Sequence, residues 1–232
     1  MAGSEADLKR DLAFACRVLA AAGQGDTIFG HVSARAAGSD RFWMKPSGLG
    51  LEEIHPDDLL LLDFSGAVLA GRHPRHDEFP IHAEVFRARP DVRCVVHTHP
   101  PCSIAFAARG GQLRPVSHEG NFFWPHGVPV FDRFTDLVKT SEQGRLVAAA
   151  LGPGTALFLR NHGIVVAHAT VEEAVWAAMS LERAAQVQLL AQPSPDAPVL
   201  YTPEAEMPLK KASIWSTDRA RAVFEYFVRR LG

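Results

Sequence analysis

Two histidines close an apolar, β-branched run near the middle of the chain, and a pair of prolines follows them. The run covers residues 91–96, and His97 and His99 stand two positions apart at its end. Alternate side chains of an extended strand share a face, so these imidazoles would lie side by side with Cα atoms roughly 6–7 Å apart. At that spacing each ring can place one nitrogen about 2.0–2.1 Å from the same divalent ion. Because proline cannot donate to a ladder, the strand should end just past the histidines.

The pair alone does not decide between metal binding and an incidental pair of core or surface histidines. A catalytic metal site also needs a third protein ligand and an open position for water or substrate. His162 is the best candidate for that ligand, because it interrupts two apolar strands and Gly163 permits close backbone approach. An Asn-His-Gly sequence taken alone is more often an ordinary turn than a ligand-bearing one. Both interpretations therefore stand at this level.

Glu78 opens a predicted helix directly before the histidine strand. In that position it can act as a general base or as a further metal ligand. A glutamate in a first helical turn also interacts favourably with the helix dipole, which is an equally natural role. The sequence leaves this choice open.

Composition bounds the class of protein. The 232 residues are 47% hydrophobic and 22% charged, which fits one globular domain over 1–232. A net charge of −2 argues against a general affinity for nucleic acid or for an anionic membrane. The N-terminal residues lack the apolar segment of a signal peptide, and no stretch approaches the roughly 20 apolar residues that span a bilayer. Three cysteines without C-x-x-C spacing argue against a disulfide framework or a zinc ribbon, so we expect a cytoplasmic protein.

Helical and strand patterns intermix along the chain without a regular βαβ rhythm, which favours a single-domain α/β fold with a mixed sheet. Five prolines predict an extended connector over about 192–208. The patterns predict helices over 5–22, 78–89, 102–108, 141–151, 171–191 and 217–230, a hairpin over 59–69, and strands over 31–35, 42–44, 155–160 and 164–167.

Six short motifs, in one order along the chain, resemble the class II aldolase/adducin family over about residues 8–190. They are Gly30-His-Val-Ser-Ala-Arg35, Pro46-Ser-Gly48, Glu78-Phe-Pro-Ile-His82, Arg89-Pro-Asp-Val92, Val95-Val-His-Thr-His99 and Asn161-His-Gly163. The resemblance implies a central mixed, mostly antiparallel sheet flanked by helices. It also implies a homotetramer with active sites at subunit interfaces. One divalent ion per subunit, zinc or manganese, would be held by His97, His99 and His162, with Glu78 as the acid/base residue.

Three positions depart from the family's phosphate-specific aldolases. Those enzymes typically carry an asparagine where His31 stands, and two serines where this chain has His76 and Asp77. Two hydroxyl donors and an amide are thereby lost, and an aspartate repels a phosphate dianion. The departures favour a substrate without a phosphate group.

The motifs look more like those of family members that decarboxylate hydroxylated aromatic or heteroaromatic carboxylates. We therefore expect a metal-dependent carbon–carbon lyase for a small carboxylate, with Glu78 as first choice of catalytic acid and His118 as second. A retro-aldolase for a small hydroxy-keto acid or sugar-like substrate, and a non-catalytic adducin-like interaction module, are the alternatives. The expected substrate contacts are His31, Ser33, Arg35, Lys45, Ser47 and Gly48.

Overall fold

A single mixed sheet organises the computed structural model, which describes residues 4–36 and 38–231. Within these residues eight strands lie in the order β4-β3-β2-β1-β5-β8-β7-β6. Every neighbouring pair is antiparallel except β6 and β7, which are parallel. The expected mixed, mostly antiparallel sheet is confirmed. The strands are β1 (His31–Ala34), β2 (Arg41–Met44), β3 (Leu60–Asp63), β4 (Val68–Ala70), β5 (Cys94–Thr98), β6 (Val130–Phe131), β7 (Ala156–Leu159) and β8 (Gly163–His168).

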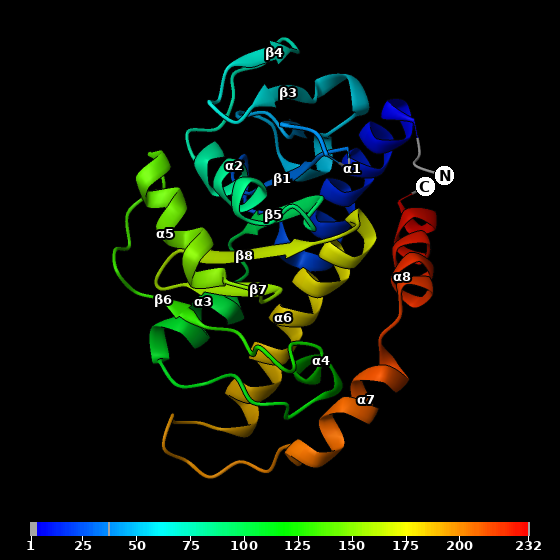
Figure 1. Cartoon of the computed structure of the whole chain (residues 1–232). Coiled ribbons are helices and arrows are strands. Elements are labelled where there is room, and N and C mark those ends of the chain that lie inside the picture. Colours follow the sequence, from blue (N-terminus) through cyan, green and yellow to red (C-terminus); the bar gives the residue numbers. More distant parts are fainter. Residues whose placement is uncertain (1–3, 37, 232) are drawn as a thin grey trace.

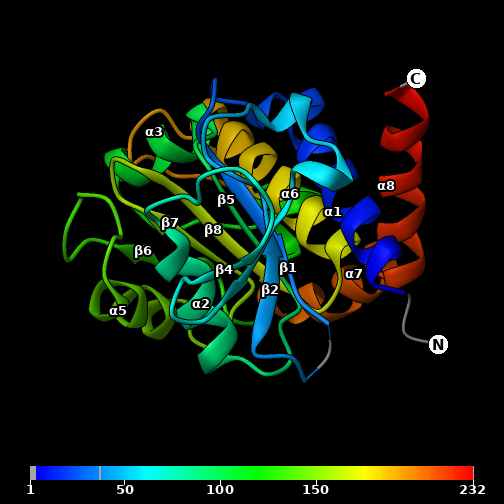
Figure 2. The same ribbon diagram turned by 90° about the horizontal axis from the view of Figure 1, so that it is seen from above.

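Helices cover both faces of the sheet (Figures 1 and 2). One face packs against α2 and α5, and the other packs against α1, α3 and α6, with α4 against α6 and α8 on the outside of α1 and α6. None of the helices in the described ranges has the length and apolar character needed to cross a bilayer. The helices are α1 (Glu5–Leu19), α2 (Phe79–Ala88), α3 (Pro101–Arg109), α4 (His118–Asn121), α5 (Ser141–Leu151), α6 (Val171–Ala191), α7 (Met207–Ile214) and α8 (Thr217–Arg230).

The register of the central strands decides which side chains meet. His31 in β1 pairs with His97 in β5, and His97 in turn pairs with Val165 in β8. Along β5, Cys94 and Val96 enter the core beneath α6, whereas Val95 enters the core beneath α2. Because side chains alternate along a strand, His31 and His97 both face α2.

Two expected elements differ from the structure. The helix expected over 5–22 is regular only to Leu19 and continues as a π-helical turn to Gln24, where Gly23 takes a φ of 82°. The connector expected to be extended over 192–208 instead ends in a 3₁₀ turn at Glu204–Glu206, and α7 follows directly. Pro208 lies in the first turn of α7, where a helix needs no N–H donor, so this proline starts a helix rather than preventing one.

Candidate active site

Three histidines and a glutamate converge where β5 and β8 meet the start of α2. His97 lies near the end of β5, His99 just beyond it, and His162 in the turn between β7 and β8, while Glu78 directly precedes α2. One ligand atom from each of the four residues lies within 4.8 Å of the others. The Nε2 atoms of His97 and His99 are 3.1 Å apart, and Glu78 Oε2 is 3.6 Å from His162 Nε2. The side chains chosen from the sequence as ligands are therefore neighbours in the fold.

The turn that presents His162 has a specific backbone. Asn161 takes a φ of 58°, in the left-handed region that asparagine tolerates better than most residues. The next strand then passes so close to β5 that a Cβ at Gly163 would lie 2.3 Å from the Thr98 carbonyl oxygen and 2.8 Å from the His99 ring. A glycine at this position lets β8 approach β5 and sets His162 beside His99. The predicted close backbone approach is confirmed.

Hydrogen bonds at Nδ1 turn the Nε2 atoms of two histidines toward the cluster. His97 Nδ1 lies 2.9 Å from the Ile164 carbonyl oxygen, and His99 Nδ1 lies 3.0 Å from a carboxylate oxygen of Asp26. Carbonyl and carboxylate oxygens only accept, so Nδ1 carries the hydrogen in both rings. Burial lowers the pKa of both rings and favours their neutral form. The Nε2 atom of each ring therefore carries a lone pair that is free to bind a metal ion.

This donor set fits a divalent ion. Two Nε2 lone pairs face each other at 3.1 Å, and His162 Nε2 is buried without a hydrogen-bond partner among the described residues. Imidazole nitrogens and a carboxylate suit zinc, manganese and iron alike, and an N–H donated from the far side of the ring is typical of metal-bound histidine. The orphaned nitrogen and the facing lone pairs would be satisfied together by one cation.

Glu78 contributes its carboxylate to the cluster rather than to the helix end. It occupies the N-cap of α2, yet its side chain caps no helical N–H. Oε1 instead accepts from the Val138 backbone N–H at 2.8 Å, and Oε2 faces the histidines. Burial raises the pKa of this carboxyl, but the neighbouring histidines, His162 and His31 first, outweigh burial and hold the pKa well below its usual range. Glu78 is thus an ionised group at the centre of the site.

His31 is the fifth residue at this centre. Its Nε2 lies 3.8 Å from Glu78 Oε2, and its ring lies 4.5 Å from the ring of His76 and 4.8 Å from that of His97, centroid to centroid. His76 is buried, whereas the side chain of Asp77 is 75% exposed and reaches Lys139 at 4.0 Å. Of the two residues that replace the family's serines, only His76 faces the site.

The Lys45-Pro46-Ser47-Gly48 segment packs beside His76. The Lys45 ammonium is fully buried and contacts the Ile28 and Pro46 carbonyl oxygens and His76 Nε2, at 3.0, 3.2 and 3.3 Å. Burial lowers its pKa to about 8. The Ser47 N–H donates to the Pro74 carbonyl, and Gly48 takes a φ of 87°. The three Lys45 protons and the Ser47 amide are thus engaged within the protein.

Two other expected site residues lie apart from the cluster. Arg35 follows the end of β1 opposite to His31, and its guanidinium donates to the carbonyl oxygens of Val92, Ser39 and Arg89. His118 begins α4, which packs against α6 and α7, so the sheet lies between His118 and Glu78 within one chain. The structure does not bring either residue to the four-residue cluster.

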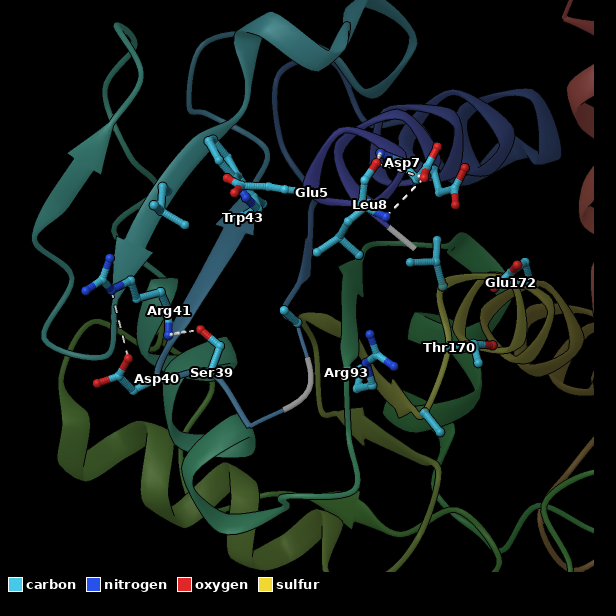
Figure 3. Close-up of a pocket in the computed structure, with 16 residues that line it drawn as sticks. Glu5, Asp7, Leu8, Ser39, Asp40, Arg41, Trp43, Arg93, Thr170 and Glu172 are labelled. Atoms are coloured by element: carbon cyan, nitrogen blue, oxygen red, sulfur yellow. Dashed lines mark hydrogen bonds and ion pairs between the residues drawn. The ribbon is translucent and has the colours of Figure 1, made fainter. Parts of the chain in front are cut away.

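A surface cavity of about 690 Å³ lies at the far end of the same strands (Figure 3). Trp43, which pairs with Ala34, forms part of its wall, together with Arg93 and the first residues of α6. The histidine cluster is at the His31–His97 end of these strands, so this cavity is separate from it.

Two polar residues were not assigned a role from the sequence. Asp26 accepts from His99, and His82 bridges His31 and Ser33, with its two ring nitrogens 2.7 Å from His31 Nδ1 and 2.6 Å from Ser33 Oγ. The available sequence signal for His82 was its spacing of four from Glu78, which places both on one side of α2. Asp26 lies in an irregular turn, where periodicity carries no information.

Residues 10–189 match the family model described as the class II aldolase and adducin N-terminal domain. The chain is 30% identical over 237 positions to a 3,4-dihydroxyphthalate decarboxylase from Arthrobacter keyseri, covering 94% of this chain and 95% of that relative. The structure resembles an aldolase II superfamily protein from Pseudomonas syringae, with a TM-score of 0.86 at 27% identity over 100% of this chain and 94% of that one. It also resembles an L-fuculose 1-phosphate aldolase from Glaciozyma antarctica PI12, with a TM-score of 0.84 at 26% identity over 97% and 88%.

The fold and the matched span define a class II aldolase-type α/β protein. The chain belongs to the class II aldolase and adducin family, and it is a lyase of that family rather than a non-catalytic interaction module. Class II aldolases use a divalent metal, and Glu78, His97, His99 and His162 form a group able to hold one.

Proposed function

We propose that this lyase decarboxylates a hydroxylated aromatic or heteroaromatic carboxylate without a phosphate group, using one divalent ion of zinc or manganese. The observation that carries the proposal is the four-residue cluster with His31 beside it, where phosphate-specific aldolases typically carry asparagine. Buried His76 fills the space next to His31 that a small serine would leave open. The decarboxylase named among the relatives, which spans nearly the whole chain, supports the same class of substrate.

The chemistry requires a place for the electron pair released when the carbon–carbon bond breaks. Bound at His97, His99 and His162, a divalent ion would act as a Lewis acid for the adjacent hydroxyl and carboxylate oxygens of the substrate. The hydrogen bonds from His97 to Ile164 and from His99 to Asp26 keep the two rings in the orientation that this role needs.

Glu78 is suited to move one proton. As an ionised carboxylate it can accept the proton of the substrate hydroxyl and return it to the ring carbon that bears the departing carboxylate. The carbon–carbon bond then breaks, carbon dioxide leaves, and the electron pair restores the aromatic ring as its oxyanion, which takes a proton from solvent. The net change is the replacement of the carboxylate by hydrogen. Because Oε1 accepts from the Val138 N–H, Oε2 is the oxygen that carries the proton.

The direct test is a product assay on the zinc- and manganese-loaded protein. We expect 3,4-dihydroxyphthalate or another ortho-hydroxy aromatic acid to release carbon dioxide in a metal-dependent reaction. Release of an aldehyde from a hydroxy-keto acid, with no carbon dioxide from any aromatic acid, would establish the retro-aldolase alternative instead.

Variants assign the roles within the site. His97→Ala and His99→Ala should lose both bound metal and turnover, while His55→Ala, which removes an exposed histidine, should lose neither. Glu78→Gln should keep metal and lose at least about 100-fold in turnover, which is the usual contribution of a general acid–base group. Undiminished turnover in Glu78→Gln would remove the glutamate from the mechanism.

We further propose a cytoplasmic homotetramer whose active sites lie at subunit interfaces and whose partners are small carboxylates rather than nucleic acid or membrane. Large apolar side chains at the end of α6, in the following connector and on α7 are exposed: Leu190 by 81%, Leu200 by 95% and Leu209 by 76%. Burying these side chains in a subunit contact would remove their apolar surface from water. Light scattering should give the mass of four 25.3 kDa chains, and a monomer mass would contradict the proposal.

A further inference from the structure

Three buried side chains continue from His31 away from the metal ligands. His31 and Ser33 lie two residues apart on β1 and face α2, and His82 lies in the first turns of that helix. All three are at most 2% exposed. One imidazole thus spans two neighbouring strand residues, with His82 Nε2 at 2.7 Å from His31 Nδ1 and His82 Nδ1 at 2.6 Å from Ser33 Oγ.

The direction of these two hydrogen bonds follows from Ser33. A buried hydroxyl needs an acceptor for its hydrogen, and among the described residues His82 Nδ1 is the acceptor that Ser33 reaches. His82 is neutral, because burial lowers its pKa to about 3, and a neutral imidazole carries one N–H. With Nδ1 accepting from Ser33, the N–H of His82 is at Nε2 and donates to His31 Nδ1.

The other end of the chain of bonds gives the same direction. His31 Nε2 faces the Glu78 carboxylate at 3.8 Å, too far for a hydrogen bond but close enough for charge to matter. A lone pair at this nitrogen would point at a carboxylate oxygen, whereas an N–H there is attracted to it. The rings of His76 and His97 on either side leave His31 little room to turn. Two independent observations therefore place the hydrogen of His31 at Nε2.

We propose that His82, oriented by the Ser33 hydroxyl, is a positioning residue that fixes the tautomer of His31, so that His31 presents an Nε2–H donor to an anionic oxygen of the substrate. The donor keeps the hydrogen-bonding function that an asparagine amide can supply at this position, and it selects for an oxygen that only accepts. The nature of that oxygen, on a hydroxylated carboxylate, rests on the proposed function. The tautomer itself does not.

The first test reads the tautomer directly in the zinc-loaded protein. Two-bond ¹H–¹⁵N correlation spectra of protein labelled at histidine distinguish protonated from bare ring nitrogens, and the His31 signals are those missing from His31→Asn. We expect the hydrogen of both His31 and His82 at Nε2. A hydrogen at His31 Nδ1 would overturn the inference whether or not any substrate is turned over, which separates this result from a failure of the proposed function.

The second test changes His82 in two ways. His82→Gln retains an N–H donor near the position of Nε2, whereas His82→Leu removes both hydrogen bonds. We expect His82→Leu to lose the fixed His31 tautomer and at least tenfold in kcat/KM on 3,4-dihydroxyphthalate, with zinc content retained, and His82→Gln to recover most of both. Val85→Ala, a buried change on the same helix, controls for loss of packing and should leave the tautomer unchanged.

Ser33→Ala keeps the test decisive if His82→Leu does not fold. Without the hydroxyl, His82 is free to place its hydrogen on either nitrogen, so the His31 signals should shift toward a mixture of tautomers and kcat/KM should fall. Wild-type spectra and turnover in Ser33→Ala would contradict the proposal. Equal losses of turnover in His82→Gln and His82→Leu, with the His31 tautomer intact in His82→Gln, would contradict it as well.

Discussion

At the scale of single residues, the site depends on groups that hold the ligands as much as on the ligands. His99 presents Nε2 to the cluster because Asp26 accepts its Nδ1–H at 3.0 Å, and His162 reaches the cluster because Gly163 lets β8 pass against Thr98. The sequence predicts His97, His99 and His162 as ligands and Glu78 as the acid/base residue, and the structure places these four side chains together. Strand alternation and the Asn-His-Gly turn are local signals. Asp26 carries no such signal, because its contact is made 73 residues away.

Asp26→Asn should weaken metal binding without removing a ligand. An amide oxygen accepts more weakly than a carboxylate, so the His99 ring is held less firmly and is less basic. We expect a loss of about 10–100-fold in zinc affinity, measured by competition with a chromophoric chelator. The exposed residue Asp57 supplies the control, and Asp57→Asn should bind zinc as the unaltered protein does. Equal affinities for all three proteins would show that Asp26 has no part in metal binding.

At the scale of elements, the first turns of α6 and α7 differ most from what the sequence pattern predicts. Thr170 caps α6 and accepts from the Glu173 backbone N–H. The Glu173 side chain, however, lies 2.8 Å from His168 Nδ1 and accepts from the Thr217 hydroxyl at 2.7 Å, so it joins the end of β8 and the start of α8 to α6. Helix periodicity located α6 and α8 but contained no information on their contact. The prolines of the connector likewise predict an extended segment, although Pro208 lies in the first turn of a helix.

Glu173→Gln should change how stability depends on pH. Its pKa is lowered from 4.5 to about 2, first by His168 and against the effect of burial, so the unfolded chain binds more protons between these values. The carboxylate therefore stabilises the fold above about pH 4.5, and this contribution is lost as the pH falls toward 2. We expect roughly 1 kcal/mol less stability at pH 7 in urea unfolding, allowing for solvent screening, and a shallower decline below pH 4.5.

The control for this change is Glu172→Gln, in the same first turn of α6. It removes a negative charge that interacts with the same helix dipole, and Glu172 does not contact His168 or Thr217. If both variants gave the same pH profile, the effect would belong to the dipole and not to the junction of three elements.

At the scale of the whole molecule, the sheet separates two cores and assigns the chemistry to one of them. The core under α2 and α5 adjoins the cluster, while the core under α1 and α6 contains the larger group of packed apolar side chains. The cluster joins β5, the β7–β8 turn and the start of α2, which are separate parts of the chain. A cation held there would link these parts and so stabilise the folded state over the unfolded chain.

Zinc should therefore raise the melting temperature, and the rise should grow with the logarithm of the free zinc concentration. At 100 times the dissociation constant the added stability is about 2.7 kcal/mol, which corresponds to roughly 5–10 °C for a domain of this size. Thermal unfolding with buffered zinc and with a chelator measures the difference. His162→Ala should remove most of the dependence, and His55→Ala should leave it intact; a melting temperature that ignores zinc in the unaltered protein would contradict a shared site.

The sequence by itself predicted the residues of the cluster, because each prediction depends on local geometry: alternation on β5 for His97 and His99, a turn followed by glycine for His162, and a helix start for Glu78. Only the tertiary structure decided what surrounds them. In the sheet, β1 pairs with β5 as well as with β2, its neighbour in sequence. This pairing places His31 beside His97 and against His82, which lies 51 residues away in the sequence. The same packing removed Arg35 and His118 from the cluster. Periodicity reports which way a side chain points within its own element, whereas the order of strands fixes which side chains it meets.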